Sequence, residues 1–208
     1  MELKGKAKKY VRGKGLKTLS HTPDWVYRIK GAFDARKDAS FSESYIAKLT
    51  HSTNALINRE ILMAEELLFP KRKKAAALIA DIKTDTDKLS GLPEATEQVS
   101  SAMDARANKL ISEARTGLSA SINSKQAELC VINEYITAIL TALEQRIDKI
   151  KFTSLRKIKS YEAGLKTRGL HNPSAVSFSE ESINKYTSRH EKLDSTIRTL
   201  ADIKEVLA

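Results

Sequence analysis

The stretch Pro93–Thr167 decides the fold, and it reads PEATEQVSSAMDARANKLISEARTGLSASINSKQAELCVINEYITAILTALEQRIDKIKFTSLRKIKSYEAGLKT. It has no proline after its first residue and only two glycines, Gly117 and Gly164. Apolar residues recur at alternating steps of three and four, which is the pattern of a coiled-coil seam, and Lys125 is its polar interruption. The seam consists of Leu118, Ile122, Leu129, Ile132, Ile136, Ile139, Leu143, Ile147 and Ile150. At about 1.5 Å per residue, this helix is expected to be on the order of 110 Å long.

We therefore expect an all-α fold, an elongated antiparallel coiled coil or helical hairpin rod around one long central helix. Its helices are expected at about 43–68, 71–89, 93–167 and 180–207. Pro70 should break the first arm because its ring removes a backbone hydrogen bond. The alternative is a four-helix bundle in which the central helix breaks at Gly117. A rod predicts a radius of gyration above the roughly 17 Å of a compact chain of this length.

The two outer arms together match the central helix in length. The first arm is expected to pair with its N-terminal two-thirds, and the last helix with its C-terminal third. The phrase SFSESYIAKLT from Ser40 recurs as SFSEESINKYT from Ser177. In each copy the second serine, Ser42 or Ser179, is expected to cap a helix, with the preceding phenylalanine packing on the first turn. An ancient duplication and convergence on the same capping chemistry both explain the likeness.

The first arm has its own seam, with a charged residue in it. The seam positions are Ile46, Leu49, Thr53, Leu56, Glu60, Met63 and Leu67. Glu60 could set the register, pair with Lys125 or with an arginine across the interface, or lie at the edge of a wider apolar stripe. Of these three interpretations, the sequence favours the edge position.

Residues 1–39 are expected to form a basic arm with a short amphipathic helix, and residues 40–208 the long helical domain. Three glycines and strong self-repulsion predict that residues 1–19 are disordered alone and order only on contact with an acidic groove or phosphate. Deleting them should leave the isolated protein as stable as before. The basic residues of this arm are Lys4, Lys6, Lys8, Lys9, Arg12, Lys14 and Lys17.

A short helix should follow the arm, with Thr22 as its cap and Pro23 as its first residue, and continue to about Lys37. Trp25, Ile29 and Phe33 lie four residues apart and form one apolar stripe. We expect this stripe to dock on the rod or on a neighbouring subunit. The alternative is a detachable anchor for a partner's groove.

Two further basic clusters lie on the long helices, within a chain of net charge +10. One follows Pro70, and the other lies near the end of the central helix. Such clusters can contact phosphate or an acidic protein surface, and they are also typical of a solvated helix face. The candidate binding residues in them are Lys71, Arg72, Lys73, Lys74, Arg156, Lys157 and Lys159.

The motifs of catalysis and metal binding are missing from the sequence. The four histidines do not occur at metal-ligand spacing, the single cysteine is Cys130, and no glycine-rich phosphate loop occurs. We therefore expect no catalytic residue, no metal, no cofactor and no small-molecule substrate. No stretch is apolar enough to span a bilayer, and the N-terminus lacks a signal's apolar run. These features predict a cytoplasmic protein, or one inside a particle assembled in the cytoplasm.

The predicted function is that of a non-enzymatic structural or adaptor subunit of a larger assembly, such as a virion or secretion machine. Its partners would be other protein subunits or further copies of itself, held through the basic arm and the apolar helix faces. The alternative is a nucleic-acid-binding protein without sequence readout, using the basic arm and the basic helix end. A membrane-surface protein is a third class, which the low hydrophobicity of the basic stretches disfavours.

Overall fold

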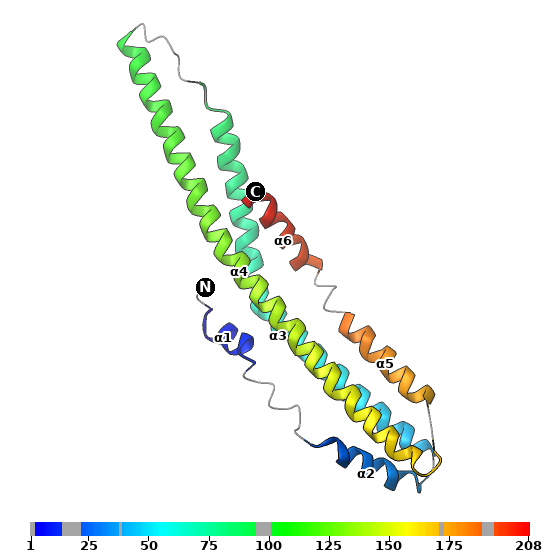
Figure 1. The fold of residues 1–208 in the computed structure, drawn as a ribbon. Coiled ribbons are helices and arrows are strands. Elements are labelled where there is room, and N and C mark those ends of the chain that lie inside the picture. Colours follow the sequence, from blue (N-terminus) through cyan, green and yellow to red (C-terminus); the bar gives the residue numbers. More distant parts are fainter. Residues whose placement is uncertain (1–2, 14–21, 38, 95–100, 171–172, 189–193) are drawn as a thin grey trace. The chain divides into compact units, whose positions relative to one another are not determined.

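The computed structural model describes residues 3–13, 22–37, 39–94, 101–170, 173–188 and 194–208. Within these ranges it contains no strand, so the expected all-α fold is confirmed. The helices are α1 (Gly5–Val11), α2 (Asp24–Asp34), α3 (Ala39–Ser90), α4 (Ala102–Lys166), α5 (Pro173–Thr187) and α6 (Asp194–Leu207) (Figure 1). The chain divides into two compact units. The first, which we call the α5 unit, is Glu2–Leu67 with Ala138–Asp194, and the α6 unit is Leu68–Thr137 with Ser195–Ala208.

The central helix α4 continues through Gly117, so the bundle broken at this glycine is wrong. A glycine inside a helix costs only about 1 kcal/mol relative to alanine, which a long helix with a packed face tolerates. After the end of α4, Gly169 takes a φ of +76°, the left-handed conformation that glycine adopts most readily. The helix begins at Ala102 rather than Pro93.

The first arm is one helix, since α3 runs through Pro70. The expected break there is wrong because Leu68 and Ala75, on either side of the proline, are both buried, and this packing offsets one missing backbone hydrogen bond. Helix α3 also begins before Ser42, which is buried inside it rather than capping it. Ser179 likewise lies inside α5, and the two phenylalanines expected to pack on the first turns are exposed.

In the α6 unit, α3 and α4 pair in antiparallel orientation. Lys74 forms an ion pair with Glu128, whereas Asp85, farther along α3, pairs at 2.6 Å with Lys125, which is earlier on α4. The polar interruption of the predicted seam is thereby satisfied. Helix α6 joins this pair through the Gln126 side chain, which donates a hydrogen bond to the Val206 carbonyl at 3.0 Å.

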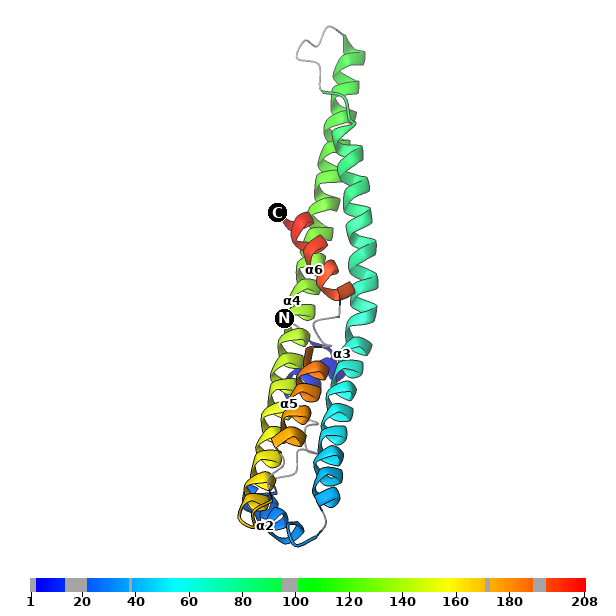
Figure 2. The same cartoon turned by 90° about the vertical axis from the view of Figure 1, so that its right-hand side faces the viewer.

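In the α5 unit, α3 and α4 are again antiparallel, and the Tyr45 and Tyr161 rings lie 4.6 Å apart. Helix α5 packs beside both of them (Figure 2), with the Thr50 and Ser179 hydroxyls 2.9 Å apart. The prediction that only the last helix pairs with the end of the central helix is therefore wrong, because α3 reaches that end itself. The predicted last helix is α5 and α6, separated by residues outside the described ranges.

The seam predicted from the sequence forms much of the core. From Leu129 to Ile150, all seven apolar seam residues of α4 are buried, while Leu118 and Ile122 are half-buried. On α3, Ile46, Thr53 and Glu60 are buried, but Met63 is exposed. The alternating spacing thus identified the buried face of α4 more completely than that of α3.

Candidate docking surfaces on the first two helices

The beginning of the basic arm is folded. Residues Gly5–Val11 form α1, and Ala7 and Tyr10 on it are 1% and 2% exposed. The expectation of a disordered arm that the long helices cannot hold is therefore wrong for the described residues 3–13. The helix propensity of this segment is low, and the burial of the Tyr10 side chain supplies the tertiary contact that stabilises the helix. Lys14 and Lys17 lie outside the described residues.

Tyr10 covers a buried ion pair between α3 and α4. The Arg146 Nε atom donates to Glu60 Oε2 at 2.7 Å, and the two side chains are 4% and 0% exposed. The same guanidinium donates to the Tyr10 carbonyl at 3.1 Å and lies 4.4 Å from the centre of its ring. Burial raises the pKa of the Tyr10 hydroxyl, so it stays neutral. Glu60 thus pairs with an arginine across the interface, and the favoured edge position is wrong.

The outer face of α1 carries unpaired positive charge. Lys4, Lys8, Lys9 and Arg12 are exposed, and none of them has an acidic partner among the described residues. Among the cations of residues 3–13, Lys6 alone has an acidic partner in the described part of the chain, Glu66 at 3.2 Å, and both side chains are well exposed to water. A cavity of about 310 Å³ lies beside this helix. It is lined by Lys6, Lys9, Tyr10, Met63, Glu66, Leu67 and Arg146.

Helix α2 begins at Asp24, one residue later than expected, and ends at Asp34. Its apolar stripe points away from the protein: Trp25, Ile29 and Phe33 are 62%, 60% and 59% exposed. Docking of this stripe on the long helices of the same chain is therefore wrong. Docking on a neighbouring subunit, or in a partner's groove, stays a prediction.

The opposite face of α2 packs on α4 through two glycines. A Cβ atom at Gly31 would lie 2.1 Å from the Tyr161 carbonyl oxygen, and one at Gly164 would lie 2.0 Å from the Arg28 carbonyl oxygen. Either side chain would push the two backbones apart. The close contact between the helices therefore requires glycine on both of them.

Polar contacts fix the two ends of α2. At its start, Arg156 pairs with Asp24 at 2.8 Å, and Ser160 donates to the Asp24 carbonyl at 2.6 Å. At its end the buried Asp34 accepts hydrogen bonds from Lys30 at 2.7 Å and from Tyr161 at 3.1 Å. Burial of the Asp34 carboxylate opposes its ionisation, but these hydrogen bonds outweigh that effect and lower its pKa. The polar face of α2 is thus the face turned to the protein.

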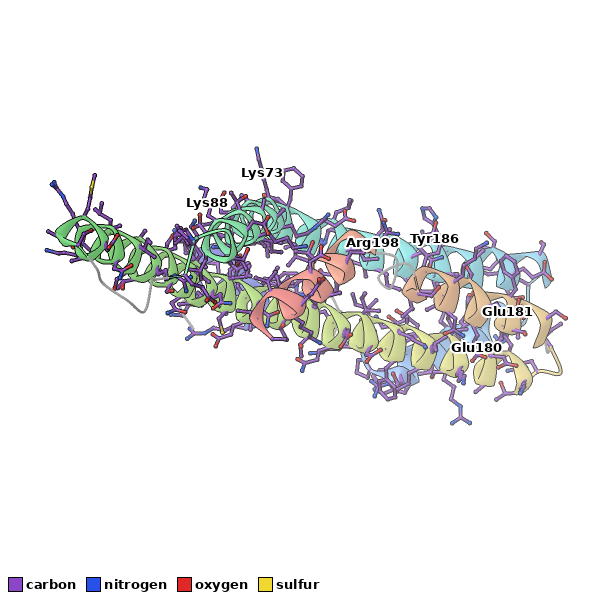
Figure 3. All side chains as sticks on the ribbon, turned by 90° about the horizontal axis from the view of Figure 1, so that it is seen from above. Lys73, Lys88, Glu180, Glu181, Tyr186 and Arg198 are labelled. Carbon is purple, nitrogen blue, oxygen red and sulfur yellow. The ribbon has the colours of Figure 1, made fainter. Side chains whose placement is uncertain are left out.

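The two basic clusters on the long helices are largely engaged within the chain. In the cluster after Pro70, Lys71 lies over the Tyr135 ring at 5.1 Å, and Lys74 pairs with Glu128. Lys73 points away from α3 into solvent (Figure 3), while Arg72 is half-buried.

The cluster near the end of α4 is also engaged. Arg156 pairs with Asp24, and Lys159 with Glu180 at 3.0 Å. Lys157 lies 5.5 Å from the centre of the Tyr27 ring. Of the three predicted basic clusters, the one at α1 therefore has the most exposed cations without an acidic partner among the described residues.

The described residues contain no group of three histidine, cysteine, aspartate or glutamate side chains placed to hold a metal ion. Cys130 is exposed and has no disulfide partner. Among the helices of these residues, none combines the length and the apolar character needed to cross a bilayer.

Sequence reasoning missed the residues that hold α2, namely Gly31, Gly164 and Asp34. The signal for the glycines was present, because a glycine inside a helix weakens it and often marks a close backbone approach. No comparable signal marked Asp34, since an aspartate on an amphipathic helix is expected in water.

The chain was compared with protein-family models, with curated proteins and with solved structures, and none of them matches it.

Proposed function

We propose that the protein is a non-enzymatic structural or adaptor subunit of a larger macromolecular assembly, held in it through its basic N-terminal helix and its exposed apolar helix faces. The proposal rests on one observation: α1 is docked on α3 and α4 and yet displays Lys4, Lys8, Lys9 and Arg12 without acidic partners among the described residues. A fixed row of cations favours an acidic protein surface as partner.

Fixing α1 through Tyr10 has an energetic consequence for binding. A disordered arm must lose conformational entropy when it binds, whereas a docked helix has already lost it on folding. The four cations therefore retain more of their interaction energy for the partner. This supports recruitment of the folded chain into an assembly.

The test is recovery of the assembly with a tagged chain from its native cells. Changing Lys4, Lys8, Lys9 and Arg12 to glutamine should lower the recovery of stoichiometric partner proteins by roughly tenfold, and raised salt should have a similar effect on the wild-type protein. A matched control changes Lys48, Lys83, Lys149 and Lys185, four exposed lysines elsewhere, and should recover the partners normally. Equal recovery with both variants would contradict the proposal.

A second candidate function is sequence-independent binding of nucleic acid. The same four cations of α1 support it, since cations without acidic partners can neutralise phosphates. The basic end of α4 supports it less, because Arg156 and Lys159 each have a carboxylate partner within the chain. We therefore place this function second.

A further inference from the structure

Helix α2 packs on α4 with its apolar face turned to solvent. Its glycine and its two acids face α4, while Trp25, Ile29 and Phe33 are each about three-fifths exposed. An amphipathic helix on a protein surface normally has the opposite orientation. A half-turn about its axis would bring large side chains to the place where the α2 and α4 backbones meet at Gly31 and Gly164. The two backbones are too close there to admit such side chains, so α2 cannot turn. The exposure of its apolar stripe therefore follows from the packing of α2 on α4.

The apolar surface continues onto the neighbouring helices. The Lys37 ammonium lies 5.6 Å from the centre of the Phe33 ring and 4.1 Å from that of Phe41 on α3, so the two rings flank one cation. At the other end of α2, Arg156 pairs with Asp24 and lies 5.9 Å from the ring centre of Phe152 on α4. Phe41 and Phe152 are themselves exposed. We call this surface, with the stripe of α2, the aromatic face.

The charge of the aromatic face is positive. Arg28, Arg36 and Lys37 are exposed beside the stripe. Of the two acids of the segment, Asp24 is paired with Arg156, and the buried Asp34 is paired with Lys30 and, at 3.5 Å, with Lys37. Arg28 and Arg36 have no acidic partner among the described residues, so their charges are not offset. A second copy of this chain would bring like charges together, which opposes association through this face. The occupant must therefore be apolar and anionic.

A bilayer fits this surface better than a groove on a protein. A groove that accepts a helix surrounds much of it, but the inner side of α2 is already packed on α4. Its partner must also accept aromatic rings from α3 and α4 beside α2. A fluid lipid surface adapts to such an arrangement, admits Trp and Phe at the headgroup level, and offers phosphates to arginine and lysine.

We propose that the aromatic face binds the surface of an anionic phospholipid bilayer, with Trp25, Ile29 and Phe33 entering the headgroup region and Arg28 and Arg36 contacting lipid phosphates. This contact goes beyond the adaptor role, because it assigns the apolar face of α2 to lipid and leaves α1 to hold the protein subunit. Together the two contacts would join an assembly, bound at α1, to a membrane surface, bound at α2.

Trp25 is the only tryptophan of the chain, so its fluorescence reports on this face alone. Purified full-length protein is mixed with phosphatidylcholine vesicles, with or without about 30% phosphatidylserine. We expect a blue shift of the emission with the anionic vesicles, and quenching by lipids brominated on their acyl chains. Unchanged emission with both kinds of vesicle would overturn the proposal.

Variants identify the face responsible. Ile29→Asp and Phe33→Asp lie at exposed positions and should each lower vesicle partitioning by roughly tenfold or more. Phe69→Asp, at an exposed phenylalanine of the α6 unit, is the matched control and should have little effect. Circular dichroism checks that the variants are folded. If they are not, quenching of the wild-type protein by brominated lipids still tests the proposal. Equal partitioning of Ile29→Asp and the wild-type protein would also overturn the proposal.

The glutamine variant of Lys4, Lys8, Lys9 and Arg12 separates this contact from the role of α1. It should keep the blue shift at saturating lipid, and loss of the shift would assign the binding to α1 and overturn the proposal. A photo-crosslinker at Ile29 that captures one protein in native cells, in the absence of vesicle binding, would assign the face to a protein groove instead. Because vesicle binding needs no other subunit, its failure would leave the adaptor proposal standing.

Discussion

Glu60 and Arg146 form an ion pair that is removed from water on both sides. Burying two charges costs free energy, and the pair is stable only while each charge has its partner and further hydrogen bonds. The Tyr10 carbonyl and ring supply the further contacts of the arginine. A charge at an apolar seam position is therefore part of the core of the α5 unit, and it connects α1, α3 and α4.

Breaking this pair from one side should be costly. Arg146→Met leaves the buried Glu60 with only the half-exposed Arg59, 3.5 Å from its Oε1 atom, as a cationic partner, so we expect the free energy of unfolding to fall by about 3 kcal/mol in urea titrations. Arg156→Ala, which removes an exposed partner of Asp24, should cost less than about 1 kcal/mol. Combining Arg146→Met with Glu60→Leu should recover part of the loss. Equal effects of the two single changes would contradict a buried pair.

The lowered pKa of Asp34 predicts a dependence on pH. A carboxyl whose pKa is lower in the folded state stabilises the protein above its unfolded pKa of about 3.9 and loses that contribution as pH falls through the folded value. Asp34→Asn should therefore destabilise the protein by about 1–3 kcal/mol at neutral pH. The difference from the wild-type protein should shrink below about pH 4. If the stability difference between Asp34→Asn and the wild-type protein were the same at neutral and at acidic pH, the charge of Asp34 would not be its cause.

At the scale of the element, the contact between α2 and α4 depends on the space left by glycine. In Gly164→Ala, the new methyl group would meet the Arg28 carbonyl oxygen, so α2 must move away from α4. We expect a lower melting temperature and faster amide exchange over residues 24–34.

Gly117→Ala is a matched control for this change. It also lies inside α4, but its Cβ would have no neighbour within 4 Å. It should stabilise the helix by up to about 1 kcal/mol, because alanine loses less backbone entropy than glycine. Stabilisation by both changes would refute the close packing of α2 on α4.

The docking of α1 changes what truncation is expected to do. Deleting residues 1–13 uncovers the Glu60–Arg146 pair and removes the burial of Tyr10, so we expect a loss of about 2 kcal/mol in urea unfolding. The glutamine variant of Lys4, Lys8, Lys9 and Arg12 keeps the buried face and should be as stable as the wild-type protein. An unchanged stability after truncation would restore the expectation that the arm is disordered in the isolated protein.

At the scale of the whole molecule, the net charge of +10 predicts non-specific attraction to polyanions. If nucleic acid is not the partner, duplex DNA should bind weakly, and affinity should fall steeply as salt rises. Fluorescence anisotropy at two salt concentrations measures this. Tight binding that persists near physiological salt, and that is lost in the glutamine variant of α1, would favour the nucleic-acid function over the adaptor.

The sequence by itself determined the helical class of the chain and the buried face of α4, because apolar residues spaced three and four apart lie on one side of a helix. These features depend on local preference and periodicity, and both can be read along the chain.

Only the tertiary structure decided which face of α2 is turned inward, whether α1 folds, and whether α3 continues through Pro70. Periodicity shows that Trp25, Ile29 and Phe33 share a face, but it does not show what that face meets. The outcome depended on a backbone contact at Gly31 and Gly164, 133 residues apart in the chain. Likewise, Tyr10 orders α1 because Glu60 and Arg146 already face one another. Such effects arise from contacts between distant residues, so local sequence preference does not reveal them.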